Sequence, residues 1–288
     1  MREKVKGEMT KVYQLLKQFL ESFLEISARP AMRILPGNLA FFLVLSFAPI
    51  ITLIALLASR FSIPLLSFLN DFEHMLPNDL FKILEMFFEG GNPPTGSLVI
   101  YLLLGFVTAS NGAHSIIIAS NTLYDIPQDS YIKRRIKAFF LTILLIFQFI
   151  FILVFLVYGN ILMKWILSFS IFASIRSSIY GSFIFLKWPI IMLVSFVLIK
   201  LLYTIAPDKK IGSKNVTRGA LFTTVGWTVT TVFYAYYANN MANYSVFYGG
   251  LSNLIVLMMW IYFVSYILVL GIAMNVSSSK MDKNKLEK

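Results

Sequence analysis

Six long runs with almost no formal charge are the feature that most restricts what this chain can fold into. A run of about 20 apolar residues has the length that crosses a hydrocarbon core roughly 30 Å thick. Inside a bilayer the backbone must satisfy its own hydrogen bonds, so such runs are predicted to be helices. The six runs are Gly37–Ser59, Ser97–Tyr124, Ala138–Met163, Phe183–Ile205, Gly219–Ala238 and Gly250–Met274.

The composition supports a membrane environment. Hydrophobic residues make up 58% of the chain and charged residues 14%, whereas soluble domains average roughly 45–50% apolar and about 25% charged residues. This surplus of apolar side chains requires a solvent other than water. We therefore predict an all-α fold, a polytopic integral membrane bundle of six transmembrane helices that forms one domain over residues 1–288.

The basic residues predict the orientation of the bundle, because cytoplasmic loops are enriched in Lys and Arg. Nineteen of them fall in the N-terminal segment, the second and fourth connections and the tail, and four fall in the other connections. This alternation predicts that both termini are cytoplasmic. The second and fourth connections supply a predicted cytoplasmic basic patch, which consists of Lys133, Arg134, Arg135, Lys137, Lys209, Lys210, Lys214 and Arg218.

The net charge of +11 is then mainly a signal of membrane topology. We expect the partner of these basic residues to be the lipid bilayer, including its anionic lipids, and not nucleic acid.

Both ends of the chain are polar. Residues 1–36 form a predicted cytoplasmic segment in which apolar residues recur every three or four positions from Met9 to Phe23, as in an amphipathic helix. Such a helix lies either along the membrane interface or docked against the spans, and the pattern leaves both alternatives open. Residues 275–288 form a predicted basic cytoplasmic tail.

The first outer connection, from Phe61 to Gly96, is long for a loop without secondary structure. Two amphipathic stretches within it, Pro64–Met75 and Asn78–Glu89, predict short helices that cap the outer mouth of the bundle.

A polar stripe crosses the second run. Ser110, His114 and Asn121 fall on one helical face with Asn111 beside them. A stripe of this kind faces a substrate path or provides hydrogen bonds between helices, and we favour the second interpretation. His114 has the chemistry of a proton shuttle, but the run supplies no carboxylate partner for it.

Two further runs have special residues. Pro49 leaves the carbonyl group of Leu45 without a helical partner, so it predicts a kink in the first run, and Ser46 lies close enough in sequence to compensate. In the fifth run, eight small or hydroxyl residues from Gly219 to Thr231 predict close helix packing, with a polar-lined passage as the alternative.

Residues for catalysis are scarce. The chain has no cysteine and two histidines, His74 and His114, and neither has the neighbouring ligands that a zinc site requires. The carboxylates of the predicted cytoplasmic face, such as Asp125, Asp129 and Asp208, are scattered in sequence. We expect no metal, no cofactor and no catalytic residue, and we expect that the protein is not an enzyme.

Several short motifs occur in order from the first run to the last. They are Asn38-Leu-Ala-Phe-Phe-Leu-Val-Leu-Ser-Phe-Ala-Pro49, Leu202-Tyr203 with Pro207, Gly219-Ala220, Tyr248-Gly-Gly-Leu251, Trp260-Ile-Tyr262 and Gly271-Ile-Ala-Met-Asn275. Together these motifs make the sequence similar to the YihY/BrkB family of bacterial inner-membrane proteins. The resemblance implies a six-span, multi-pass protein of the bacterial cytoplasmic membrane. Family members carry an old ribonuclease BN label, regarded as a misassignment, and one branch is called a virulence factor.

One position departs from that family pattern. Members typically carry a Glu in the last motif, where this chain has Ala273. Any proton- or cation-coupled step that depends on that Glu therefore does not transfer to this chain.

Three hypotheses about function follow. The first is a transporter or a lipid- or amphiphile-handling permease, the second is a non-catalytic scaffold that binds anionic lipid or a partner through its basic loops, and the third is the ribonuclease of the old label. We favour the first and rank the third last, because phosphodiester hydrolysis requires a metal clamp or a positioned acid and base. The sequence patterns do not define substrate, energy coupling or oligomeric state. The predicted pathway residues are Asn38, Ser46, Ser110, Asn111, His114, Asn121 and Asn275.

Overall fold

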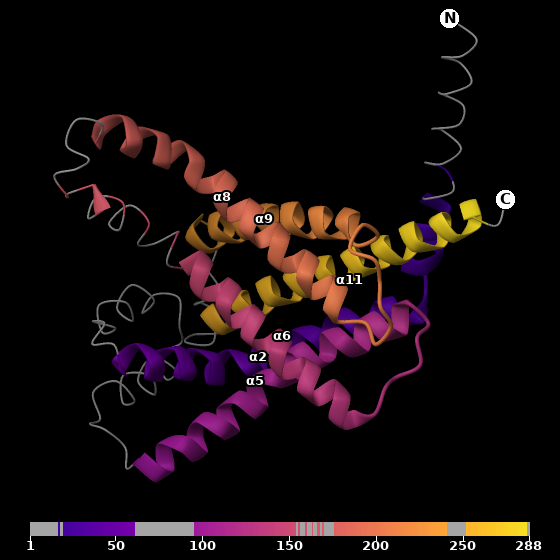
Figure 1. Ribbon diagram of the computed structural model, residues 1–288, viewed down its shortest axis with the longest axis horizontal. Helices are drawn as coiled ribbons and strands as arrows, with labels where there is room; N and C mark the ends of the chain where they lie inside the picture. The colour runs from indigo at the N-terminus through magenta and orange to yellow at the C-terminus, as the bar shows by residue number, and fades with distance from the viewer. Residues whose placement is uncertain are drawn as a thin grey trace, which may run out of the picture.

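The computed structural model describes residues 17, 20–60, 95–153, 155, 159, 163, 166–167, 169, 176–240 and 252–286, and this part of the chain is helical and contains no strand. The predicted outer-loop helices, residues 1–16 of the predicted amphipathic segment and most of the last ten residues of the third run lie outside the described residues. The main helices are α2 (Pro30–Arg60), α5 (Thr95–Leu123), α6 (Tyr131–Leu153), α8 (Arg176–Ile205), α9 (Thr217–Asn240) and α11 (Ser252–Leu286) (Figure 1).

Each of these helices overlaps one of the six apolar runs in order, so the all-α class predicted from the sequence is confirmed. Two described segments, Ile179–Ile205 and Ile255–Ser279, are long and apolar enough to cross a membrane by length and composition. A shorter apolar segment covers Pro30–Ser46.

Local sequence explains where several helices begin and end. Pro30 is the first residue of α2, a position where its missing N–H costs no helical hydrogen bond. The Ser130 carbonyl group, just before α6, accepts a bond of 3.2 Å from the Arg134 amide. The α8 helix ends at Ile205, because Pro207 disfavours helical geometry at the residue before it. Pro189 lies inside α8 and removes one of its hydrogen bonds.

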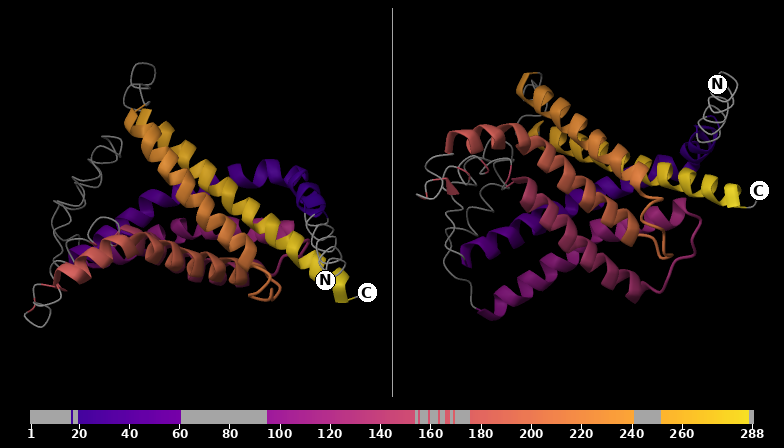
Figure 2. Two further views of the ribbon diagram at one scale, coloured as in Figure 1. Left: turned by 90° about the horizontal axis from the view of Figure 1, so that it is seen from above. Right: turned by 45° about the horizontal axis from the view of Figure 1, so that its top comes forward.

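The six helices form a ring in chain order. Each packs against the next, and α11 returns to pack against α2. Seen from above, the α9–α11 pair diverges from α5, α6 and α8 toward one end, so the ring is wedge-shaped (Figure 2).

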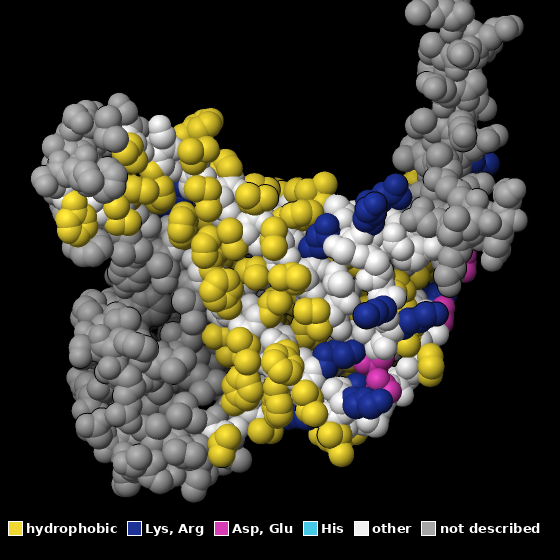
Figure 3. Space-filling model, in the orientation of Figure 1, with side chains coloured by type: hydrophobic (Ala, Val, Ile, Leu, Met, Phe, Trp, Pro, Cys, Tyr) yellow, Lys and Arg dark blue, Asp and Glu magenta, His cyan; other side chains and the backbone are white. Residues whose placement is uncertain are grey.

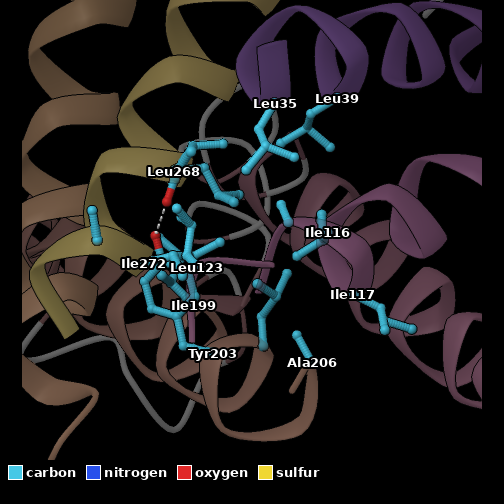
Figure 4. Packing of buried hydrophobic residues seen from close by; sticks show 14 of the residues in the cluster. Leu35, Leu39, Ile116, Ile117, Leu123, Ile199, Tyr203, Ala206, Leu268 and Ile272 are labelled. Atoms are coloured by element: carbon cyan, nitrogen blue, oxygen red, sulfur yellow. Dashed lines mark hydrogen bonds between the residues drawn. The ribbon is translucent and has the colours of Figure 1, made fainter. Parts of the chain in front are cut away.

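The buried core lies toward the narrow end of the wedge. It combines the first half of α2, the second half of α5, the start of α6, the end of α8, the start of α9 and the second half of α11. Figure 4 shows this packing, with Leu35 and Leu39 of α2 facing Leu268 and Ile272 of α11. The short helical segment at residues 20–27 joins the same core through Ile26, which is fully buried. The described part of the segment therefore contacts the core through Ile26, while Leu20 and Leu24 are exposed.

Large apolar side chains cover the outside of the ring. Phe185 on α8 is 81% exposed, Phe140 on α6 is 66% exposed and Phe233 on α9 is 68% exposed. Continuous apolar surface of this kind is rare on soluble monomers and is expected where lipid replaces water. Figure 3 shows it as a broad hydrophobic region over the middle of the molecule.

Candidate functional site

Charged side chains gather at the narrow end of the ring. In Figure 3 the Lys and Arg side chains lie at the right of the view, beside the hydrophobic region. We call this part the basic end. It contains the starts of α2, α6 and α9 and the ends of α5, α8 and α11, with the connections 124–130 and 206–216.

A buried carboxylate organises the basic end. Asp208 follows α8, and its Oδ2 atom accepts hydrogen bonds from Asn121 Nδ2 at 2.5 Å and from the Asp129 amide at 3.1 Å. The Asp208 amide donates in return to Asn121 Oδ1 at 2.8 Å. Lys137 of α6 pairs with Asp208 Oδ1 and also donates to the Pro207 carbonyl oxygen at 3.0 Å. We call these five residues the Asp208 hub.

The hub keeps its carboxylate ionised although the Asp208 side chain is only 3% exposed. Burial alone would raise the pKa of Asp208, but the hydrogen bonds from Lys137, the Asp129 amide and Asn121 together hold it below its usual value. A charged, fully bonded carboxylate therefore connects the ends of α5, α6 and α8.

The end of α5 is shaped by a C-cap. Asp125 has a positive φ of 54°, and the Ile126 amide donates to the Asn121 carbonyl oxygen at 2.9 Å. This is the geometry of a Schellman turn. The turn directs the Asp125 carboxylate to Arg29, whose two terminal nitrogens donate three bonds of 3.0 to 3.1 Å. The residues that precede α2 are thereby attached to the end of α5.

Close packing joins α9 to α11. A Cβ atom at Gly219 would overlap the Gly271 carbonyl oxygen and the Asn275 side chain, and one at Gly271 would overlap the Thr223 and Tyr203 hydroxyl groups. The Gly219 amide donates to Asn275 Oδ1 at 2.8 Å, so Asn275 caps the first turn of α9 from a neighbouring helix.

Tyr203 of α8 completes this junction. Its hydroxyl group donates to the Leu268 carbonyl oxygen at 2.8 Å, the bond drawn in Figure 4. It therefore accepts from Thr223 Oγ1, at 2.6 Å. Gly219 and Thr223 of the fifth run therefore serve helix packing.

The polar stripe of the second run has mixed surroundings. Ser110 is fully buried and donates to the Val107 carbonyl oxygen of its own helix at 2.7 Å. Asn111 accepts from Arg135 of α6 at 2.9 Å. His114 lies edge-on to Tyr131, with ring centroids 6.1 Å apart, and within the described residues its Nε2 atom has no hydrogen-bond partner.

Ser46 lies in the contact between α2 and α5. It is fully buried, and its hydroxyl group donates to the Phe42 carbonyl oxygen at 2.6 Å. The Ser46 hydroxyl group therefore does not compensate for the hydrogen bond that Pro49 removes from the Leu45 carbonyl group. The α2 backbone is helical through Pro49.

Two other positions named from the sequence lie in opposite environments. Asn38 is exposed on α2. Ala273, where the family resemblance leads us to expect a Glu, is fully buried in the core.

The predicted basic patch divides into two groups. Arg135 and Lys137 are committed to other helices, since Arg135 also donates to the Val107 carbonyl oxygen at 2.8 Å. Arg134 donates to the Asp129 carbonyl oxygen at 3.0 Å. The remaining members are exposed, namely Lys133, Lys209, Lys210, Lys214 and Arg218.

The hub, the Arg29–Asp125 pair and the Tyr203 junction were not assigned from the sequence. One signal was present for the hub: Lys137 directly precedes the third run and Asp208 follows the fourth, so antiparallel neighbours bring both to one end. Among the described residues, no group of three or more His, Asp or Glu side chains is placed to hold a metal ion.

Comparison with known proteins gives a family match. The family model described as virulence factor BrkB matches residues 32–288. The ribonuclease-like protein YfkH of Bacillus subtilis (strain 168) is 28% identical over 250 residues, which cover 86% of this chain and 90% of YfkH.

Relatives named as membrane proteins also match. A UPF0761 membrane protein of Chlorobium luteolum is 23% identical over 259 residues, covering 85% of this chain and 56% of that protein. The UPF0761 membrane protein VSAL_I2938 of Aliivibrio salmonicida is 32% identical over 115 residues, covering 40% of this chain and 36% of that protein. No solved structure matches.

Proposed function

Because the chain belongs to the virulence factor BrkB family, we propose that it is a six-span permease of the bacterial cytoplasmic membrane that moves an amphiphilic molecule, with both termini in the cytoplasm. The observation that carries this proposal is the ring of six apolar helices, tied together by the Asp208 hub at one end and diverging at the other. A pathway that is closed on one side of the membrane has this form.

The position of the charges supports the orientation. The exposed lysines of the basic patch lie beside the hub, so the closed end of the ring is the cytoplasmic end under the positive-inside rule. Reporter fusions at Met1 and Lys288 test this directly. We expect both reporters to be active only in the cytoplasm, and reporters on different sides would refute six spans.

Transport is tested with reconstituted vesicles. We expect purified protein to increase the rate at which at least one of a set of fluorescent lipids, among them an uncharged glycolipid and phosphatidylglycerol, crosses the bilayer. We expect His114→Ala to lower that rate, since within the described residues the His114 Nε2 atom has no hydrogen-bond partner. Ser110→Ala is the control, because the Ser110 hydroxyl group donates its hydrogen bond to the Val107 carbonyl oxygen of its own helix. Equal flux with protein and with empty vesicles, for lipids of several headgroups, would contradict the permease.

A scaffold is the second candidate, and one observation favours it. Asn111, Asn121 and Asn275 all bond to groups outside their own helix, as interhelical packing residues do. A scaffold that binds anionic lipid depends on its exposed charges, so reversal of Lys133, Lys209 and Lys210 to Glu would abolish enrichment of phosphatidylglycerol around the purified protein. A permease with a separate pathway would keep its flux in the same variant.

We further propose that the chain is not an enzyme, although YfkH is named ribonuclease-like. Supporting this, Asp125 and Asp208 are held in ion pairs with Arg29 and Lys137. Purified protein incubated with RNA should leave it intact. Degradation that disappears in Asp125→Ala would overturn this part of the proposal.

A further inference from the structure

We propose that Gln148 is a subsite in the membrane interior that holds the uncharged, hydroxyl-bearing headgroup of an amphiphile. This inference rests on the proposed six-span arrangement and names the chemistry that its interior would recognise.

Gln148 lies deep in the bundle. It is eleven residues beyond Lys137 on α6, about 16 Å farther along the helix axis. The third run contains no Lys, Arg, Asp or Glu, so a hub at the cytoplasmic surface places Gln148 near the middle of the bilayer.

The side chain of Gln148 is buried. It is 4% exposed, and Leu141, two turns earlier on the same helical face, is fully buried. The adjacent Phe147 and the nearby Ile143 are 55% and 54% exposed and form the outer face of α6. The amide group therefore lies on the buried side of α6, beyond Ala138 and Leu141, the α6 residues of the core at the basic end.

The amide of Gln148 is unsatisfied. Within the described residues, neither Oε1 nor Nε2 has a hydrogen-bond partner. An unpaired amide is strongly disfavoured in hydrocarbon, because no water replaces the lost bonds. Thr142, a buried polar residue of the same helix, differs in that its hydroxyl group bonds the Ala138 carbonyl oxygen at 2.7 Å. Gln148 thus offers its full bonding capacity to a bound molecule.

The chemistry of the amide selects the ligand class. A Gln side chain presents two N–H donors and one carbonyl acceptor. A hydroxyl group both donates and accepts, so glycerol or sugar headgroups satisfy both amide atoms. An anion satisfies only the donors, and the third run supplies no cation to neutralise it.

A binding experiment tests this assignment. The thermal midpoint of the purified full chain is measured with monooleoylglycerol, which has two hydroxyl groups, and with oleate, which has the same acyl chain and an anionic head. We expect monooleoylglycerol to raise the midpoint by 3 °C or more in the native protein and in Thr142→Val. Gln148→Met, which keeps the side-chain length, should show no rise, and Gln148→Leu is the second variant if Gln148→Met does not fold.

The outcomes separate this inference from the proposed function. The subsite is overturned if the thermal midpoint of the native protein does not rise with monooleoylglycerol, or if it rises equally with oleate. It is also overturned if the midpoint of Gln148→Met rises as much as that of the native protein. These outcomes hold whether or not the protein transports lipid. If the protein moves no lipid but the Gln148-dependent rise in thermal midpoint is observed, only the permease proposal is overturned.

Cysteine labelling provides an independent measurement, because the chain has no cysteine of its own. A thiol reacts with hydrophilic methanethiosulfonates as the thiolate, which forms only in a polar environment. In vesicles, Gln148→Cys should react at least tenfold faster than Phe147→Cys, which faces lipid. Equal rates would contradict a polar site at this position.

Discussion

Buried polar contacts are concentrated at one end of the described helix ring, and the apolar outside of the ring has none of this kind. At the basic end, buried polar groups connect the helices: the Asp208 hub joins α5, α6 and α8, and the Tyr203 junction joins α8, α9 and α11. Toward the opposite end, the described parts of α8 and α9 expose large apolar side chains such as Phe185 and Phe233.

This difference follows from the solvent. In hydrocarbon, apolar side chains gain little by leaving lipid for protein, so hydrogen bonds and close backbone contacts must hold helices together. The basic end is rich in both kinds of contact. Substitutions there are therefore expected to be costly, and substitutions on the apolar outside nearly neutral.

The largest effect is expected for Lys137→Met. This change leaves the buried Asp208 carboxylate without its cation and should destabilise the fold by about 3–5 kcal/mol. Unfolding in a mixed-detergent titration measures it. Lys133→Met is the matched control, because the Lys133–Asp129 pair is exposed at 3.6 Å and is worth about 0–1 kcal/mol. Equal losses in the two variants would refute a structural role for the hub.

A second prediction concerns Gly271→Ala. The added methyl group would overlap the Thr223 and Tyr203 hydroxyl groups, and overpacking of this kind costs about 1–3 kcal/mol. At Gly181 the same change meets no atom within 4 Å and should be stabilising by about 0.5–1 kcal/mol, as is usual for Ala in a helix. The two variants should therefore shift the thermal midpoint in opposite directions, and shifts of the same sign would count against the tight junction.

A third prediction is the pH dependence of the basic end. The pKa of Asp208 is lower in the folded protein than the ordinary pKa of an aspartic acid side chain. The ionised carboxylate therefore contributes its full stability above about pH 4–5 and loses it as the pH falls through the folded pKa. Thermal midpoints at pH 7, 4 and 3 should decline less steeply for Asp208→Asn than for the native protein. Parallel declines would show that Asp208 does not control acid stability.

A smaller loss than for Lys137→Met is expected for Tyr203→Phe. It removes the hydroxyl group that bonds Leu268 and Thr223, at a cost of about 1–2 kcal/mol for buried bonds. Phe185→Ala on the apolar outside is the comparison, with an expected loss below about 0.5 kcal/mol. A larger loss for Phe185→Ala would reverse the contrast between the two ends.

Much of the fold was visible in the sequence because hydrophobic runs depend on local composition. Each of the six runs overlaps a helix. The small residues of the fifth run also indicated close packing, which Gly219 shows.

The sequence did not predict which side chains pair with one another. Asn121 was assigned to a stripe on one helix, yet its partner Asp208 lies 87 residues away. Asn275 was considered as a pathway residue, and the structure has it capping α9. Helical periodicity predicts which residues share a face, but not which helix that face meets.

The sequence by itself determined that the chain is helical, that the helices are apolar, and which connections carry the positive charge, because these properties depend on runs of neighbouring residues. Only the tertiary structure decided that Asp208 is buried and bonded and that Gly271 leaves room for the Tyr203 hydroxyl group. It also decided that the Gln148 amide has no hydrogen-bond partner within the described part of the chain. Those facts depend on how six helices are arranged around one another, and residues distant in sequence meet only after that arrangement has formed.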